Sequence, residues 1–155
     1  MSNATGHFAV VGVAAGGGTK TAPLTFAPSI PMENSIGKTH WAIAEGYIPP
    51  DDTDRSPALT SHETACLLNT SDQEARVQIT LYFSDREPVG PYHIQVPARR
   101  TKHVRFNDLQ DPEPVPRGTD YASLLVSDVP IVVQHTRLDS RQVETALLST
   151  IAYAG

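Results

Sequence analysis

The sequence predicts an all-β protein, an antiparallel β-sandwich of jelly-roll-like type with about eight short strands. The stretch ARVQITLYF at 75–83 alternates apolar and polar residues, and YHIQV at 92–96 repeats this alternation. A period of two gives a strand one buried and one wetted face, which is typical of antiparallel sheets. Between these stretches, SDREPVGP supplies the Asp, Pro and Gly that a turn requires. No stretch shows a convincing helical period, which favours an all-β class.

The other expected strands are shorter and are separated by turn residues. Pro130 stands just before one of them, where its missing N–H does little harm. The stretches 48–59 and 107–118 are rich in Pro and Asp and should be irregular. The last segment, RQVETALLSTIAYA, could also begin as a helix. In chain order, these expected strands are 40–47, 61–69, 101–106, 120–127, 131–139 and 145–153.

The size and composition of the chain limit the classes of function. Its 155 residues fit one domain with a genuine core. A net charge of -5 argues against a protein devoted to wrapping nucleic acid, although a local basic stripe is compatible with it. Cys66 is the single cysteine, so a reducing cytoplasm fits best. No apolar run approaches the roughly 20 residues of a membrane helix.

The first 35 residues differ in composition from the rest of the chain. They contain only Lys20 and Glu33 as charges and are rich in Gly, Ala, Thr and Pro without a sustained period. Such a segment buries too little apolar area to offset its ordering entropy. We therefore expect a flexible extension over 1–35 and one folded domain over 36–155.

The sequence lacks the common motifs of catalysis and cofactor binding. It has no nucleophile elbow, no His-Glu-x-x-His, no Cys-x-x-Cys pair and no glycine fingerprint for dinucleotides. The six histidines are scattered, with none at the spacing of a local metal-binding pair. We predict a protein that is not an enzyme and that holds neither a metal nor a cofactor.

The stretch IVVQHTRLD is the first candidate for a binding site. One face of this expected strand runs from Ile131 and Val133 to His135, Arg137 and Asp139. An apolar face that becomes polar is typical of a strand that leaves the core for a cleft or an interface. The alternative is a solvated strand end with a local ion pair between Arg137 and Asp139, worth at most ~1 kcal/mol.

Trp41 adds an aromatic residue to this candidate site. It alternates with Ile43, Glu45 and Tyr47 along an expected strand. A Trp and a Tyr beside a carboxylate and a guanidinium would suit a sugar, because the ring stacks on the apolar face while charged groups bond the hydroxyls. The alternative is that Trp41 belongs to the core.

The stretch VPARRTKHVRF is the second candidate, as a site for an anion or a protein partner. It brings Arg99, Arg100, Lys102 and Arg105 close together in an acidic chain. Strand alternation places these cations on both faces, which weakens the idea of a phosphate groove. The alternative is a charged edge strand that is protected against aggregation.

Five long blocks of the sequence resemble the Anabaena sensory rhodopsin transducer family, and the resemblance extends from Ser35 to the C-terminus. It implies a soluble cytoplasmic β-sandwich protein that assembles as a homotetramer and works with a rhodopsin-type receptor. It also implies that the chain is related to small-molecule binding domains, with sugars as the expected ligands, and that DNA binding is a further role of the family. The blocks are SIGKTHWAIAEGYIPP, SHETACLLN, YFSDREPVGPY, VPARRTKHVRFNDL and VPIVVQHTRLDSRQVETALLSTIAYA.

The resemblance leads to a functional hypothesis and a set of candidate residues. We expect a non-enzymatic adaptor that couples a membrane sensory receptor, through its cytoplasmic side, to a cytoplasmic output. The alternatives are a sugar or sugar-acid binding module and, third, a DNA-binding regulator. The family domain begins near its initiating Met, so Met32 is a candidate true start. The residues carried over from the shared blocks are Trp41, Glu45, His62, Arg99, Arg100, Lys102, His135, Arg137 and Asp139.

Overall fold

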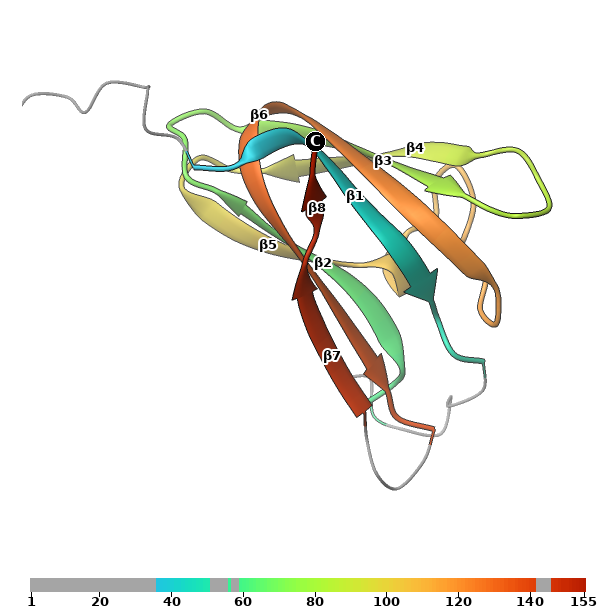
Figure 1. Cartoon of the computed structure of the whole chain (residues 1–155). Helices are drawn as coiled ribbons and strands as arrows, with labels where there is room; N and C mark the ends of the chain where they lie inside the picture. Colours follow the sequence, from blue (N-terminus) through green and yellow to red (C-terminus); the bar gives the residue numbers. More distant parts are fainter. Residues whose placement is uncertain (1–35, 51–55, 57–58, 142–145) are drawn as a thin grey trace, which may run out of the picture. The chain divides into compact units, whose positions relative to one another are not determined.

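The structure, a computed structural model, describes residues 36–50, 56, 59–141 and 146–155. The predicted extension over 1–35 lies outside the described residues. The described part contains eight strands and one short 3-10 turn (Figure 1). They are β1 (Lys38–Tyr47), β2 (His62–Asn69), β3 (Ala75–Tyr82), β4 (Val89–Val96), β5 (Arg100–Arg105), the turn Phe106–Asp108, β6 (Asp120–Asp139), β7 (Ala146–Ile151) and β8 (Tyr153–Ala154).

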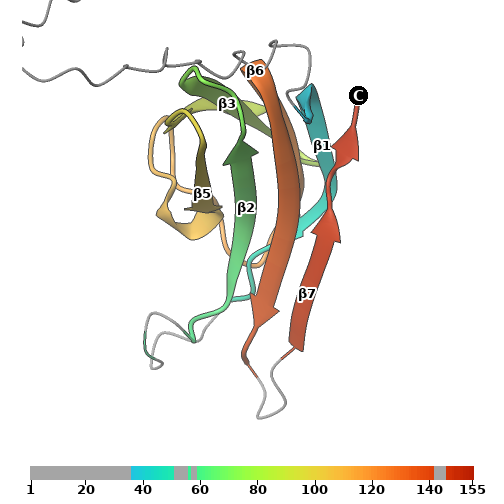
Figure 2. The same cartoon turned by 90° about the vertical axis from the view of Figure 1, so that its left-hand side faces the viewer.

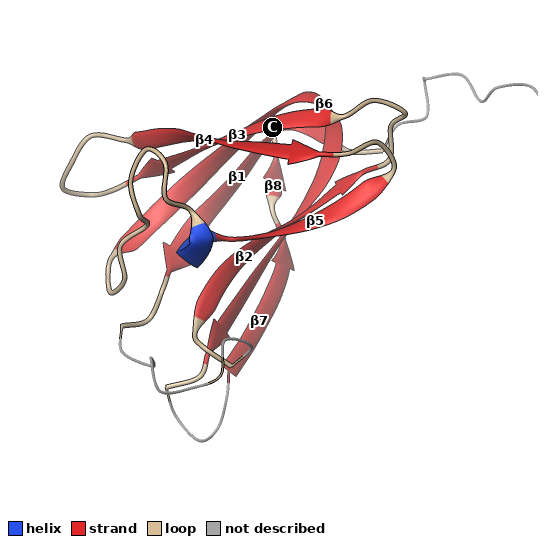
Figure 3. Cartoon of the chain, turned by 180° about the vertical axis from the view of Figure 1, so that it is seen from behind, coloured by secondary structure: helices blue, strands red, loops and turns tan. Residues whose placement is uncertain are grey.

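The long strand β6 joins two sheets. Its first half pairs with β1 and β3, as far as Ser127 on the β3 side, and its second half pairs with β2 from Val132 and with β7. Every pairing is antiparallel, in the orders β4-β3-β6-β1-β8 and β5-β2-β6-β7. Figure 2 shows β5, β2, β6 and β7 side by side, and Figure 3 shows that strands dominate the described chain. The predicted all-β fold class is confirmed.

One detail of the strand prediction was wrong. The expected strands 120–127 and 131–139 are one continuous strand, and Pro130 lies inside it. It is tolerated because it falls between the end of the β3 ladder at Ser127 and the start of the β2 ladder at Val132. The segment 145–153, which had an alternative as a helix, is a strand from Ala146 with a break before β8.

A single hydrophobic core lies between the two sheets. In β3 the residues that alternate toward it are fully buried, as the period of two predicts. Burial of such side chains contributes about 1.5–3 kcal/mol each. Among the described residues, no helix is long and apolar enough to cross a membrane. The main core residues are Trp41, Ile43, Ala65, Leu67, Val77, Ile79, Leu81, Tyr92, Val96, Val104, Phe106, Leu125, Ile131 and Val133.

Candidate functional site

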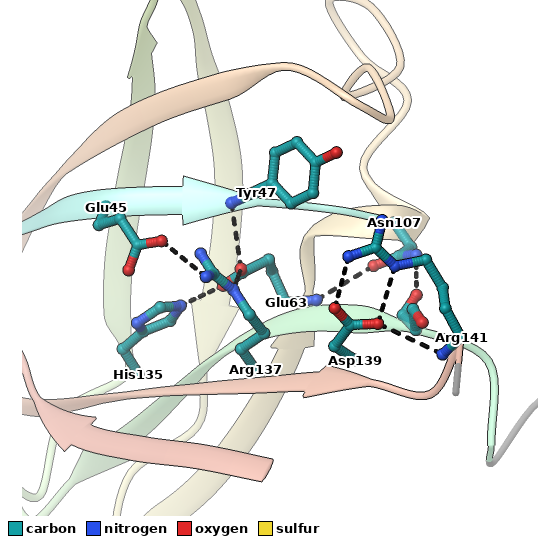
Figure 4. Close-up of polar contacts among 9 residues, drawn as sticks. Glu45, Tyr47, Glu63, Asn107, His135, Arg137, Asp139 and Arg141 are labelled. Atoms are coloured by element: carbon teal, nitrogen blue, oxygen red, sulfur yellow. Dashed lines mark hydrogen bonds and ion pairs between the residues drawn. The ribbon is translucent and has the colours of Figure 1, made fainter. Parts of the chain in front are cut away.

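A cluster of charged side chains lies between β1 and the paired strands β2 and β6 (Figure 4). β1 contributes Glu45, β2 contributes Glu63, and β6 contributes His135 and Arg137. The backbone of Glu63 is in register with that of Arg137, and His135 is two residues away on the same strand. Because side chains two residues apart share one face of a strand, both β6 groups reach the same carboxylate.

Glu63 is the centre of this cluster and is fully buried, with 0% exposure. His135, itself 2% exposed, donates its Nε2–H to one carboxylate oxygen. The other oxygen accepts hydrogen bonds from Nε of Arg137 and from the backbone N–H of Tyr47, the latter at 3.1 Å. A buried carboxylate is stable only when it is paired and hydrogen-bonded. The three donors meet that requirement.

Arg137 connects the buried carboxylate to the surface. Its Nη1 contacts Oε1 of Glu45 at 2.6 Å, and Glu45 is 67% exposed. Burial acts to lower the pKa of Arg137, but its hydrogen bonds to Glu63 and Glu45 outweigh this effect and raise the pKa. The remaining nitrogen, Nη2, is buried and has no hydrogen-bond partner among the described residues. It therefore has an N–H group to offer to an acceptor atom.

Tyr121 of β6 closes the inner side of the cluster. Its ring packs edge-on against Phe106, 5.9 Å between ring centroids, and lies over Gly46 of β1. The hydroxyl is buried and has no hydrogen-bond partner in the described part of the chain. Burial, followed by the negative charge of Glu63, raises the pKa of Tyr121, so its hydroxyl stays neutral.

A groove of about 490 Å³ adjoins the cluster between β1 and the C-terminal strands. Glu45 and His135 line one part of it, and Leu148, Thr150 and Tyr153 line another. A concave site with mostly apolar walls and a few polar groups is typical of small-molecule binding. The groove therefore places the charged cluster within reach of a ligand.

The structure brings together three of the predicted ligand-binding residues, namely Glu45, His135 and Arg137. Asp139 is not part of the cluster. The alternative interpretation, a local pair between Arg137 and Asp139, does not hold, because Asp139 is bound in a bidentate pair by Arg141 instead. The hydrogen bonds from Arg141 lower the pKa of Asp139.

Two other predicted ligand-binding residues have local partners. His62 lies at the start of β2, and its Nδ1 is 2.7 Å from the backbone oxygen of Thr60. Trp41 is 5% exposed and belongs to the core, with its Nε1–H bonded to the backbone oxygen of Lys38 at 2.9 Å. A stacking role for Trp41 would require the core to open.

The predicted basic site lies on β5, an edge strand that pairs with β2. Arg99 lies just before it with a φ of 54° and makes an exposed contact with Asp72, 3.4 Å from Nε to Oδ1. Arg100 and Lys102 donate to backbone oxygens and are exposed, whereas Arg105 is half-buried. This arrangement fits a protected edge strand.

Glu63 is the residue that the sequence prediction did not select. In HETACLLN it occupies the same face of β2 as Ala65 and Leu67, which are both fully buried. A carboxylate at a position of the apolar face is the signal that could have identified it. Such a residue needs buried cationic or N–H partners, and the two side chains that supply them here, those of His135 and Arg137, lie more than 70 residues away in the chain.

Comparison with known proteins identifies the family. The family model "Anabaena sensory rhodopsin transducer" matches residues 36–154. A solved structure called Anabaena sensory rhodopsin transducer is 64% identical, with a TM-score of 0.60, over 66% of this chain and 99% of that chain. The crystal structure of Thermotoga maritima 1070 is 32% identical, with a TM-score of 0.68, over 77% of this chain and 96% of that chain. The curated proteins contain no match. The chain belongs to the Anabaena sensory rhodopsin transducer family.

Proposed function

We propose that this protein is a soluble transducer that couples a rhodopsin-type sensory receptor to an output in the cytoplasm. The observation that carries this proposal is the family match over residues 36–154, supported by 64% identity to a solved transducer. The role needs a docking face rather than a reaction centre, so we propose that it is non-enzymatic.

Charge supports docking at the cytoplasmic side of a membrane protein. Cytoplasmic loops of membrane proteins carry an excess of Lys and Arg. This chain has a net charge of -5, and complementary charges accelerate the encounter of two partners. Exposed Glu45, at the surface end of the charged cluster, is one group that could receive a receptor cation. We also propose the homotetramer that the family resemblance implies.

Binding to a sensory rhodopsin in lipid nanodiscs tests the receptor role. We expect saturable binding that weakens as salt rises, because exposed charges are screened. Empty nanodiscs of the same lipid are the control. Equal signals from receptor and empty nanodiscs would contradict the proposal.

A second proposal, binding of a sugar or sugar acid, is supported by the groove beside Glu45 and His135. Glu45 lines the groove and is exposed, so its carboxylate supplies an acceptor for a ligand hydroxyl. A thermal-shift screen tests it, because a ligand at a hundred times its Kd stabilises the native state by about 2.7 kcal/mol. Glu45→Gln should abolish the shift, while Arg86→Gln, which breaks the exposed pair with Glu113, should leave it unchanged.

The third alternative, DNA binding, would use the cations of the edge strand β5. Arg99 is engaged with Asp72, and Lys102 donates to the backbone oxygen of Gln95. If DNA binds at this edge, its affinity should fall steeply with salt, and Arg99→Ala with Lys102→Ala should flatten that dependence. Binding that is insensitive to salt would contradict this proposal.

A further inference from the structure

The groove beside the charged cluster has an apolar wall. Ile43 of β1, Leu148 and Ile151 of β7 and Tyr153 of β8 are among the residues that form it. Leu148 is 44% exposed, Ile151 62% and Tyr153 75%, so solvent reaches this wall. It can bind the apolar body of a small molecule, because the contact removes apolar surface from water.

Two members of the charged cluster also line the groove, and both offer an acceptor atom. Oε1 of Glu45 is held by Arg137, and the other carboxylate oxygen makes no such contact with a described residue. His135 is joined to Glu63 through Nε2 (Figure 4), and no residue of the described chain hydrogen-bonds its Nδ1. Because a carboxylate only accepts, the proton of His135 lies on Nε2, which leaves Nδ1 as an acceptor.

The charge beside the groove is negative. Of the described residues that line it, none is Lys or Arg. The neighbouring cation Arg137 is shared by two carboxylates, those of Glu45 and Glu63. One guanidinium against two carboxylates leaves one negative charge, and the neutral tautomer of His135 adds none. An anionic ligand would be repelled here, whereas a cation would be attracted.

We propose that the groove binds an organic ammonium ion with an apolar body. This inference rests on the second proposed function, ligand binding in the groove, and names the class of ligand. An ammonium group has three N–H donors and no acceptor, so it matches the carboxylate of Glu45 and Nδ1 of His135. The exposed ring of Tyr153 adds a contact, because an aromatic face attracts a cation. The apolar body lies along Leu148 and Ile151, and a sugar acid is excluded by its charge.

Three probes that differ in one group test this selectivity. Phenethylamine, phenethyl alcohol and hydrocinnamate share an apolar body and are cationic, neutral and anionic near neutral pH. In amide NMR titrations of the full chain, we expect the amine to perturb Glu45 and Thr150 of the groove and not Gln78 on the outer face of β3. It should bind about threefold to fivefold more tightly than the alcohol, which is the range that an exposed ion pair contributes. Hydrocinnamate should bind more weakly than the alcohol.

A pair of matched variants separates the local carboxylate from the net charge of the chain. Glu45→Gln keeps the shape of the side chain and should lower the affinity for phenethylamine to that for the alcohol. Asp85→Asn also removes one negative charge, but Asp85 is exposed and does not line the groove, so it should bind the amine like wild type. Equal losses in the two variants would assign the preference to net charge and overturn the proposal.

The tautomer of His135 gives a readout that needs no substitution. A long-range nitrogen–proton NMR spectrum of the unchanged protein should show Nδ1 without a proton, and its resonance should shift when phenethylamine binds. Equal affinities for the three probes, tighter binding of hydrocinnamate, or protons on both ring nitrogens at neutral pH would overturn the proposal. A sugar that raises the Tm while the amine leaves the groove amides unchanged would overturn the ammonium class alone. Ligand binding in the groove would then still stand, so the two proposals fail separately.

Discussion

Glu63 and His135 are hydrogen-bonded to each other, and both side chains are almost completely buried. They come from β2 and β6 and are separated by 72 residues in the chain. The bond fixes which ring nitrogen of His135 carries the proton, because a carboxylate only accepts. The same carboxylate orients Arg137, so one buried charge sets the geometry of two side chains, of which His135 lines the groove.

Replacing Glu63 should destabilise the fold strongly. Glu63→Gln removes the negative charge that His135 and Arg137 share and leaves Arg137 paired only with the exposed Glu45, so we expect a loss of about 3 kcal/mol in the free energy of unfolding. Glu45→Gln is the matched control. Because Glu45 is 67% exposed, this substitution should lower the free energy of unfolding by at most about 1 kcal/mol. Urea titration of both variants measures this, and equal losses would contradict the central role of Glu63.

The pair between Asp139 and Arg141 should make the free energy of unfolding depend on pH in the acid range. The folded pKa of Asp139 is lowered below its ordinary value of 3.8, so the pair stabilises the fold above that pH. This stabilisation is lost as pH falls through the lowered pKa. Asp139→Asn should therefore be less stable than wild type at pH 6, with the difference vanishing at strongly acid pH. Urea unfolding at several pH values checks this, and a pH-independent difference would contradict it.

Removing the hydroxyl of Tyr121 should stabilise the fold. The hydroxyl is buried without a partner among the described residues, and such a group costs about 1–3 kcal/mol. Tyr121→Phe keeps the ring packing against Phe106 and Phe83, so we expect a gain of about 1 kcal/mol. A rise in Tm supports this account. A clear loss would show that the hydroxyl has a partner.

Gly46 should tolerate no side chain. A Cβ at this position would lie 2.4 Å from Cε2 of Tyr121, so we expect Gly46→Ala to cost about 1–3 kcal/mol. The loss should shrink in a Tyr121→Leu background, where the ring is absent. A double-mutant cycle measures this coupling, and additive effects would show that the clash is not with Tyr121.

The sequence predicted local structure better than long-range structure. The alternation in β3 and β4 marked both strands because burial of one face requires a period of two. The sequence did not show that 120–127 and 131–139 form the single strand β6. A proline usually interrupts a strand, and Pro130 is tolerated only because neither β2 nor β3 pairs with β6 at that position, which the sequence alone does not show.

The sequence also predicted only some residues of the candidate site. Glu45, His135 and Arg137 were selected by their chemistry along single strands. Glu63 was not, because its role depends on partners from another strand. Trp41 shows the converse case, since a residue type suited to ligand stacking is buried by the pairing of β1 with β6 and β8.

As a transducer, this chain should pass the state of a sensory rhodopsin to an output. The most direct measurement is its affinity for a sensory rhodopsin in nanodiscs, in the dark and under illumination, by isothermal titration calorimetry or fluorescence anisotropy. We predict saturable binding to the receptor whose Kd differs between the two states, because a transducer must bind them unequally. Equal affinity in dark and light, or no binding beyond that to empty nanodiscs, would contradict the account.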